Sequence, residues 1–304
     1  MVSYFIREFC WENLERYVKL YNEVSNLTDT VKSLDTEYMS QVLSQPSCIP
    51  EDNCFIAEKN DGQFVGFALV SNEKRIDRAV STGGVIVSNK YKGVEEGLLE
   101  RSVRRATDLG VSLLHVEATA EDEFYRKVLE DAKFRGVKNY WKMMWQGENV
   151  PSIQIPDQYS FRSFKIGIDE QQLTDLQNKA FEASWGFSPN TIEEITSRTK
   201  IKDTSPDGII FLDHLNYPSA YVWTHKMSDG ISSAGWIGMT GVHPDYRGRG
   251  LGRAVVTAGI VYLKSQGVST IELEVDADNV PARELYLSFG FNKTGQTVWY
   301  EKHL

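Results

Sequence analysis

The chain has 304 residues, of which 41% are hydrophobic and 25% are charged, a composition typical of a folded globular protein. Its formal charge of −9 opposes non-specific binding to nucleic acid, which depends on a basic surface. No stretch reaches the roughly 18 apolar residues of a membrane-spanning helix, and Arg7 and Glu8 interrupt the apolar stretch that a signal peptide needs. The odd number of cysteines, three, indicates reduced thiols. We therefore expect a cytoplasmic protein without a nucleic-acid or membrane partner.

A faint internal repeat divides the chain in two. The segment 87–97 (VSNKYKGVEEG) echoes the segment 242–252 (VHPDYRGRGLG), and 6–9 aligns with 161–164 at the same offset of 155 residues. One such match can arise by chance, but two at a single offset favour a duplication. The segment 147–157 contains two prolines and a glycine and is typical of a linker or a crossing strand. We therefore expect two domains, 1–150 and 151–304.

The second copy has the more legible pattern of elements, which alternates between periods of two and about 3.6 residues. In chain order it predicts a strand at 160–165, a helix at 169–181, a short helix at 191–198 with Asn190 as its candidate cap, strands at 209–212, 219–224 and 235–242, a helix at 252–266, a strand at 270–275, a helix at 282–289 and a closing strand at 297–302. This order indicates an α/β domain with a mixed sheet.

A glycine-rich turn with three arginines follows the strand 235–242 and opens the next helix. A helix N-terminus offers unpaired backbone N–H groups and the positive end of the dipole, so it attracts phosphate. Glycines let the backbone approach a pyrophosphate closely, and Arg247, Arg249 and Arg253 add positive charge. A turn with solvated arginines is the alternative. The segment is neither a Walker P-loop nor a convincing dinucleotide fingerprint, because no Gly-Lys-Ser/Thr follows and its helix comes late in the domain.

These residues resemble a known family. The segment 242–252 is similar to the pyrophosphate loop of the GCN5-related N-acetyltransferases (GNAT), and 273–286 (LEVDADNVPARELY) with 289–291 (FGF) resembles that family's second motif. The resemblance covers 235–291. It implies two tandem GNAT acyl-CoA N-acyltransferase folds, the first of them degenerate, that use acetyl-CoA as cosubstrate and no metal ion.

The resemblance also implies a role for individual residues in holding the cofactor. The backbone at Thr240 and Val242 would pair with the pantetheine arm as an added strand would. Asn279 would form a hydrogen bond to the same arm. The remaining cofactor-binding residues, which would hold the pyrophosphate, are Arg247, Gly248, Arg249, Gly250, Leu251, Gly252 and Arg253.

Acyl transfer to an amine needs a neutral nitrogen and a proton for the departing thiolate. By resemblance Tyr286 is the general acid, although it could instead be a core aromatic residue. Glu274 is the candidate general base, in a Leu-Glu-Val segment similar to that of ribosomal-protein N-terminal acetyltransferases. Its alternative is a surface carboxylate on an alternating strand, with water or another carboxylate as the base.

Other polar and aromatic residues carry weaker signals. Trp185 and Phe187 lie where this fold usually places the lip of its acceptor site, but such aromatics are often simply core. His214 and His225 are too scattered for a metal site, and no C-x-x-C or H-E-x-x-H motif occurs. We therefore expect no metal.

The first copy has lost the glycine-rich turn. At the 155-residue offset Glu95 takes the place of Gly250, with Glu96 beside it, and two carboxylates would repel a pyrophosphate. The downstream asparagine motif is also missing. We therefore expect a degenerate GNAT-like first domain, with a vestigial cofactor site as the alternative.

The tandem arrangement resembles the mycothiol synthase-like acetyltransferases. Those enzymes carry a glutamate on the strand before the loop where this chain has Trp236, which argues against carrying over their acceptor. The sequence thus predicts an acetyl-CoA-dependent N-acetyltransferase, a monomer or homodimer, that transfers acetyl directly to a primary amine of a small molecule or a peptide N-terminus. The alternative is a non-catalytic acyl-CoA-binding regulatory protein.

Overall fold

The computed structural model describes residues 4–25, 34–46, 48–86, 90–148, 152, 155–202, 204–228 and 233–304. The chain divides into two compact units. Unit 1 consists of Met1–Tyr140 and Gly295–Leu304, and unit 2 consists of Trp141–Thr294. Neither unit coincides with one copy of the repeat. The boundary that we place at residue 150 concerns where one repeat ends and the next begins, and it stays a prediction.

Unit 1 is built on a mixed sheet in which β4 and β5 run parallel. The strand order is β1-β2-β3-β4-β5-β12-β6. The strands are β1 (Tyr4–Glu8), β2 (Cys54–Lys59), β3 (Phe64–Glu73), β4 (Arg78–Val85), β5 (Leu113–Thr119), β6 (Arg135–Trp145) and β12 (Asn292–His303).

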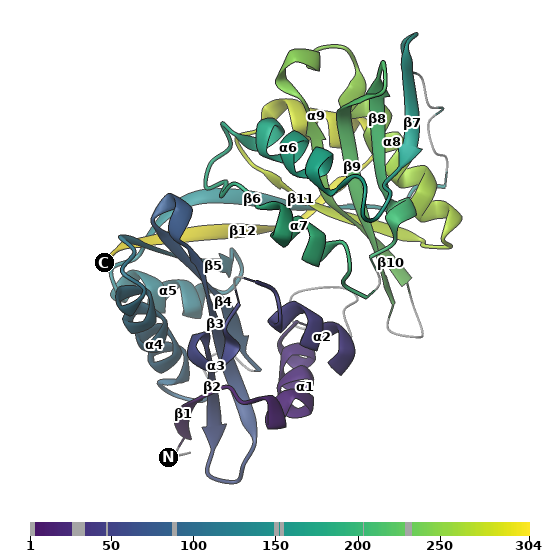
Figure 1. Cartoon of the computed structure of the whole chain (residues 1–304). Helices are drawn as coiled ribbons and strands as arrows, with labels where there is room; N and C mark the ends of the chain where they lie inside the picture. The colour runs from purple at the N-terminus through teal and green to yellow at the C-terminus, as the bar shows by residue number, and fades with distance from the viewer. Residues whose placement is uncertain are drawn as a thin grey trace. The chain divides into compact units, whose positions relative to one another are not determined.

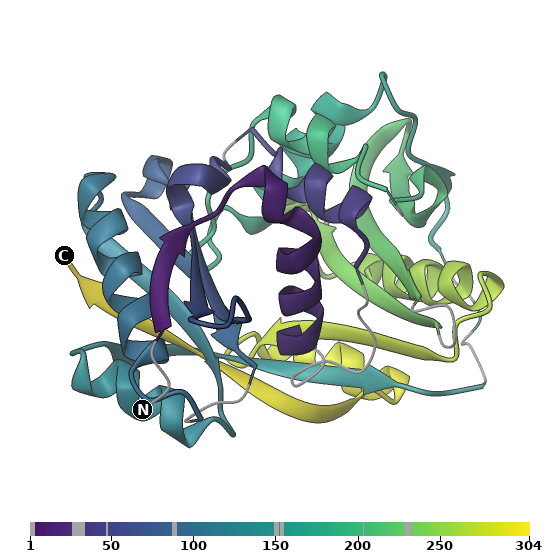
Figure 2. The same ribbon diagram turned by 90° about the horizontal axis from the view of Figure 1, so that it is seen from below.

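Helices cover both faces of the unit 1 sheet (Figures 1 and 2). On one face α1 (Leu14–Ser25) and α2 (Thr36–Leu43) bury Tyr17, Leu20 and Met39 against β2 and β3. On the other face α4 (Val94–Asp108) and α5 (Glu123–Asp131) pack on strand residues such as Ala57, Val70 and Leu114. The short elements are η1 (Trp11–Asn13), α3 (Pro50–Asn53) and η2 (Lys74–Ile76).

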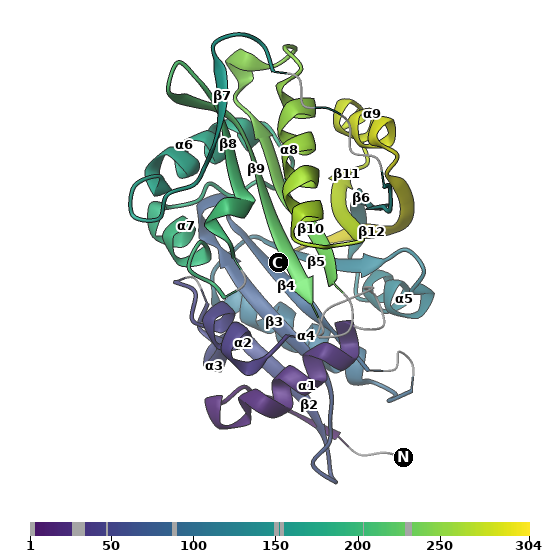
Figure 3. The same cartoon turned by 90° about the vertical axis from the view of Figure 1, so that its right-hand side faces the viewer.

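Unit 2 repeats this plan, with strand order β6-β11-β10-β9-β8-β7. Figure 3 shows α8 against one face of β8–β10, with α6 and α7 on the other. Its strands are β7 (Tyr159–Ser163), β8 (Ile209–His214), β9 (Tyr217–Ser228), β10 (Ser233–Val242) and β11 (Thr270–Asp276). Its helices are α6 (Glu170–Phe181), α7 (Ile192–Arg198), α8 (Leu251–Ser265) and α9 (Val280–Phe289), with short turns η3 (Pro206–Gly208) and η4 (Pro244–Tyr246). The expected α/β class with a mixed sheet is confirmed.

The buried strand β9 shows why both faces need helices. Its residues alternate, so Ala220 and Val222 face α8 whereas Tyr221 and Trp223 face α6 and α7. All four are almost completely buried. Helix α8 lies close to β9 because Gly259 has no side chain; a Cβ there would approach Val222 Cγ2 to 2.9 Å.

The two units share a residue-by-residue correspondence that supports the duplication. In β1 and β2 the register pairs Tyr4 with Lys59, and 155 residues later β7 and β8 pair Tyr159 with His214. From the ends of β4 and β10 onward the offset is 157, because Val85 and Val242 both end their strands and Gly93 and Gly250 both cap the following helix. The second copy is thus longer by a net two residues between β8 and the end of β10 than the first copy is between β2 and the end of β4.

This correspondence corrects our alignment of the loops. Gly93, and not Glu95, takes the place of Gly250, since both are N-caps with positive φ, 87° and 78°. Glu95 therefore corresponds to Gly252. Residues 87–89 of the echo lie outside the described residues.

Two further expectations about the second copy are wrong. Helix α7 is capped by Thr191, which forms a capping box with Glu194, because its hydroxyl reaches the N3 amide; Asn190 does not cap it. The final strand does not close the second copy's sheet, since β12 pairs with β5 of unit 1, from Thr297 opposite Thr119 onward. Residues 229–232, between the expected strands 219–224 and 235–242, lie outside the described residues.

Candidate active site

Two parallel strands part in the middle of unit 2. Strands β10 and β11 are paired only from Ala234 opposite Thr270 to Trp236 opposite Glu272. Strand β10 then continues to Val242, and β11 continues to Asp276. A bulge between Ile237 and Met239 shifts the pairing of β10 with β9 at the same point, and bulges bend the strand that carries them. The parted strands leave backbone edges on which an extended ligand could pair as an added strand.

The glycine-rich loop lies at the end of β10. Gly248 and Gly250 have φ angles of 77° and 78°, and a Cβ on either would meet no other atom within 4 Å. Backbone conformation, rather than space, therefore requires glycine here. The N–H groups of the first turn of α8 have no acceptor within the helix, and none of the described side chains caps it. This arrangement suits an anion.

The three arginines of the loop are exposed and each already makes a hydrogen bond. Arg247 donates to the carbonyls of Ala180 at 2.7 Å and of Val242 at 3.3 Å. Arg249 donates to the carbonyl of Asp245 at 3.1 Å and to the Tyr159 hydroxyl at 3.4 Å. Arg253 donates to Ser288 Oγ at 2.6 Å. These bonds hold the guanidinium groups around the start of α8.

Helix α9 begins beside the parted strands. Asn279 is its N-cap, and its side-chain oxygen accepts from the Ala282 N–H at 3.2 Å. Its amide NH₂ group makes no hydrogen bond with another described residue, so it can still donate to a ligand. The capping function was not part of our expectation for Asn279, although an asparagine two residues before a proline is a typical signal for a helix start.

Tyr286 lies in the interior of unit 2. It is 8% exposed, packs edge-on against Phe291 and belongs to the cluster on the α8 face. Burial raises the pKa of the Tyr286 phenol, and the nearby Thr240 hydroxyl partly opposes this. Thr240 Oγ1 itself is buried and makes no hydrogen bond of normal geometry with a described residue. The structure thus places two expected site residues, one from β10 and one from α9, next to each other.

Glu274 lies on the other side of the sheet. Its neighbours Leu273 and Val275 belong to the cluster on the α8 face, so the exposed Glu274 side chain leaves β11 on the opposite face. The structure therefore does not bring Glu274 and Tyr286 together on one face. A group held between the parted strands would have one of them on each side.

The segment 182–191 between α6 and α7 carries the expected acceptor lip. Trp185 and Phe187 are half-buried, and Phe187 contacts Phe181 with 5.8 Å between ring centroids. The segment begins beside β10, because a Cβ on Gly241 would lie 3.0 Å from the Cβ of Ala180. The lip therefore starts next to the parted part of β10.

Sequence reasoning missed three partners of the arginines: Ala180, Tyr159 and Ser288. Ala180 acts through its carbonyl, which no side-chain pattern reveals. Tyr159 had a signal in the sequence, because the repeat places a tyrosine, Tyr4, at the equivalent position. In the structure Tyr4 donates to the carbonyl of Gly93 in the matching loop of unit 1.

The matching region of unit 1 shares part of this arrangement. Strands β4 and β5 pair only from Arg78 opposite Leu113 to Ser81 opposite Val116, and α4 also starts at a glycine that no described side chain caps. The region differs in its bulge and in its charges. Strands β3 and β4 pair without a shift from Gly66 opposite Val85 to Glu73 opposite Arg78. The first turn of α4 carries Glu95, which is buried, and Glu96. Burial, followed by the charges of Asp122, Glu95 and Glu117, raises the pKa of Tyr125, which places that ring among carboxylates.

The structure also bears on the expectations about metal ions, membranes and thiols. Among the described residues no three histidine, cysteine, aspartate or glutamate side chains are grouped so that they could hold a metal ion. No helix in the described part of the chain is long and apolar enough to cross a membrane. All three cysteines are free thiols.

Comparison with known proteins identifies the family. The model of the acetyltransferase (GNAT) family matches residues 170–291. A mycothiol acetyltransferase of Arthrobacter sp. is 30% identical over 243 residues, covering 78% of this chain and 74% of the relative. A mycothiol acetyltransferase of Stackebrandtia nassauensis is 28% identical over 253 residues, 80% of each chain.

Solved structures match the whole chain. A GCN5-related N-acetyltransferase from Sphaerobacter thermophilus aligns with a TM-score of 0.77 at 19% identity, covering 100% of this chain and 97% of that one. A tandem GNAT protein from the clavulanic acid biosynthesis pathway aligns with a TM-score of 0.76 at 14% identity, covering 99% and 98%. These two matches show the tandem fold. The chain belongs to the GNAT family of acetyltransferases and is an acetyl-CoA-dependent N-acetyltransferase.

Proposed function

We propose that unit 2 holds acetyl-CoA between the parted strands β10 and β11 and transfers its acetyl group directly to a primary amine. The observation that carries this proposal is the bulge between Ile237 and Met239 where the β10–β11 pairing ends, because β3 and β4 of unit 1 pair without such a shift. It lies in the same unit as the N-terminus of α8, which no described side chain caps. The pantetheine arm would pair with the backbone at Thr240 and Val242. The pyrophosphate would accept from the backbone between Gly248 and Arg253, and the amide of Asn279 would donate to the arm.

The placement of the two ionisable candidates suits a direct transfer. The amine nitrogen attacks the thioester carbonyl carbon, the C–S bond breaks, and no acyl-enzyme forms. Tyr286 protonates the departing thiolate, and its raised pKa keeps the phenol protonated near neutral pH. Glu274, on the other face of β11, accepts the proton that the amine loses, directly or through water. Acid and base would thus act from opposite sides of the thioester.

We propose that the first unit has lost the corresponding cofactor site. Glu95 and Glu96 place two carboxylates where a pyrophosphate would lie, and like charges in a partly buried site repel strongly. Tyr125 occupies the space beside them. Unit 1 would then have a role other than acetyl transfer.

The acceptor that we propose is a primary amine of a small molecule. The lip that carries Trp185 and Phe187 would contact it. We do not transfer mycothiol chemistry from the named relatives, because the bulky, half-buried Trp236 occupies the position expected to hold a glutamate. The net charge of −9 favours a cationic amine through long-range attraction.

Calorimetric titration with acetyl-CoA tests the cofactor site. We expect one site per chain, and we expect Glu274→Gln to leave the affinity within about twofold while it lowers the turnover of an amine found in a library screen. Two sites per chain would contradict the loss of function in unit 1. No binding would contradict the placement of the cofactor, and equal turnover in Glu274→Gln would remove that residue from the mechanism.

A further inference from the structure

The two units differ at a pair of matched positions where a strand meets the end of a helix. The strand and helix are β6 and α9 for unit 2, and β12 and α5 for unit 1. In unit 2 the indole Nε1 of Trp145 donates to the carbonyl of Phe289 at 2.9 Å, and both aromatic side chains are buried. The positions 157 residues away are Lys302 and Ala132, and Lys302 Nζ donates to the carbonyl of Ala132 at 2.6 Å. The hydrogen bond is kept while both aromatic rings are replaced by smaller or flexible side chains.

Unit 1 contains a cavity at this place. Its volume is about 480 Å³, and it lies between α4 and α5 with Lys302 at its edge. Its apolar lining consists of Leu99, Val103, Phe124, Val128 and Ala132. A cavity of this size falls within the range of small-molecule sites. The matched positions explain it, since an alanine and a lysine stand where unit 2 packs two aromatic rings.

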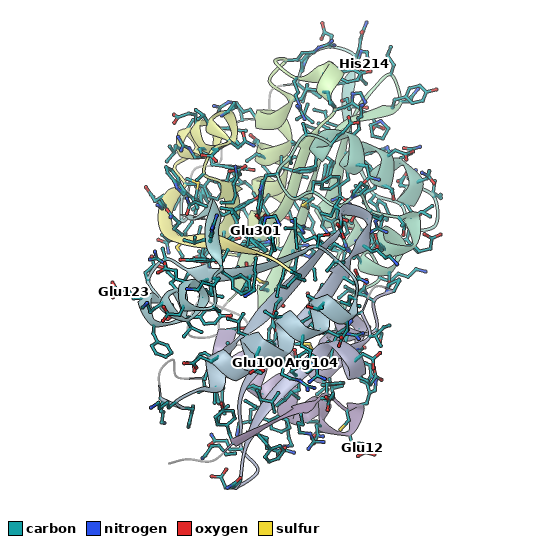
Figure 4. The ribbon with its side chains drawn as sticks, turned by 90° about the vertical axis from the view of Figure 1, so that its left-hand side faces the viewer. Glu12, Glu100, Arg104, Glu123, His214 and Glu301 are labelled. Atoms are coloured by element: carbon teal, nitrogen blue, oxygen red, sulfur yellow. The ribbon has the colours of Figure 1, made fainter. Side chains whose placement is uncertain are left out.

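The charges around the cavity are unequal. On α5, Lys127 pairs with Asp131, and Lys302 is already bound to the Ala132 carbonyl. On α4, Glu96 and Glu100 line the cavity one helical turn apart, and neither forms a hydrogen bond or ion pair with another described residue. Figure 4 shows Glu100 on the outer side of α4. Two carboxylates at this spacing repel each other, and a cation between them relieves that repulsion.

We propose that this cavity is a binding site for a small organic cation with an apolar body, such as an aralkyl ammonium ion. The apolar part would fill the space beside Ala132 and Val128, where burial of apolar surface is favourable. The positive group would lie between Glu96 and Glu100. This proposal does not depend on acetyl transfer, because none of the lining residues belongs to unit 2.

Methyl-resolved NMR of the full chain can test the site directly. Benzyltrimethylammonium is a suitable probe, because its quaternary nitrogen cannot be acetylated and its aromatic body matches the apolar lining. We expect millimolar probe to shift the methyl signals of Leu99, Val128 and Ala132. We expect the shifts to weaken at about 0.5 M salt, which screens exposed charges. Benzoate, of similar size and opposite charge, should leave these signals unchanged.

Two variants locate the interaction. Ala132→Phe restores the aromatic side chain found in unit 2 and should abolish the shifts. Glu96→Gln with Glu100→Gln removes the two charges with little change in shape and should weaken binding by about tenfold. Glu12→Gln, at the far end of the same unit (Figure 4), is the matched control and should bind as the parent does.

Three results would overturn the proposal. The first is no methyl shift with millimolar probe, and the second is equal shifts with benzoate. The third is unchanged binding in the Glu96/Glu100 double variant. This third test remains decisive even if the Ala132→Phe variant does not fold. The acetyltransferase activity of that double variant is a separate readout and should equal that of the parent.

Discussion

Arg247 Nη2 donates to the carbonyl of Ala180 at 2.7 Å and so joins the glycine-rich loop to the last turn of α6. The last four carbonyls of a helix have no intrahelical donor, and a cation there also meets the negative end of the dipole. The arginine expected to face the pyrophosphate therefore also fixes the helix from which the acceptor lip departs. The cofactor loop and the proposed acceptor side are coupled through one guanidinium group.

Arg247→Met should lower the free energy of unfolding by about 1 kcal/mol, because a charge-assisted hydrogen bond at an exposed site is lost. Arg249→Met is the matched control; its bonds are longer, 3.1 and 3.4 Å, and the loss should be below about 0.5 kcal/mol. Urea unfolding of both variants measures the difference. If Arg249→Met lowers the free energy of unfolding more than Arg247→Met does, the hydrogen bond from Arg247 to Ala180 is not the main link between the loop and α6. The Michaelis constant for the amine should rise in Arg247→Met.

Tyr286→Phe should reduce turnover by about 10²-fold and leave acetyl-CoA affinity unchanged, because the ring still packs against Phe291 while the proton donor is lost. Tyr217→Phe changes an exposed tyrosine, 75% accessible, and is the control. Because the pKa of Tyr286 is raised, its deprotonation should not limit turnover below about pH 10. Turnover equal to the parent's would assign Tyr286 to the core alone.

Gly250→Glu should abolish acetyl-CoA binding, since it adds both backbone strain and a carboxylate where the pyrophosphate is proposed to lie. Gly267→Glu separates these effects, because Gly267 has the same φ of 78° and equally open surroundings at the other end of α8. Either substitution should cost about 1–2 kcal/mol of stability. Calorimetry should show a loss of affinity in Gly250→Glu alone. Similar losses in both variants would point to general destabilisation.

His115 should make unit 1 less stable as the pH falls. Burial lowers its pKa, the hydrogen bond to Glu301 at 2.8 Å opposes this, and Arg78 lowers it further. Arg78 donates to Nδ1, so the ring is neutral with its proton on Nε2. The unfolded chain, with an ordinary pKa of about 6.5, then binds the proton first, and stability falls as the pH drops below that value.

Thermal unfolding between about pH 7.5 and 5.5 measures this effect, since the window spans the ordinary histidine pKa. The substitution His115→Gln removes the titrating group, and the introduced amide can still accept from Arg78 and donate to Glu301. The variant should lose less stability than the parent over this range. Parallel curves would show that His115 does not contribute to the pH dependence.

Local patterns in the sequence predicted much of unit 2. The start of α8 was placed to within one residue, because glycine before a run of apolar residues marks both the turn and the helix. The expected pyrophosphate loop, Thr240 and Tyr286 all lie beside the parted strands. The roles of these residues stay predictions.

Non-local pairing was not predictable in the same way. The partner of Arg247 is a backbone carbonyl 67 residues away, and backbone acceptors leave no trace in side-chain type. The alignment of Glu95 with Gly250 was wrong because the offset changes from 155 to 157 between β8 and the end of β10. Both a turn length and the bulge between Ile237 and Met239 contribute to this change, and neither has a strong sequence pattern. The prediction that β12 closes the second copy's sheet was also wrong, since apolar alternation predicts a strand but not the strand beside which it lies.

That last strand has a consequence for how the chain is made. Unit 1 includes Gly295–Leu304, and Tyr300 lies in its core at 2% exposure. Domains usually fold in the order in which the ribosome delivers them. Here the half that is synthesised first lacks one of its inner strands until Gly295–Leu304 has been made, so unit 2 has its full sequence earlier than unit 1. Loss of the segment Gly295–Leu304 would therefore damage unit 1 rather than unit 2, although unit 2 immediately precedes it in the chain.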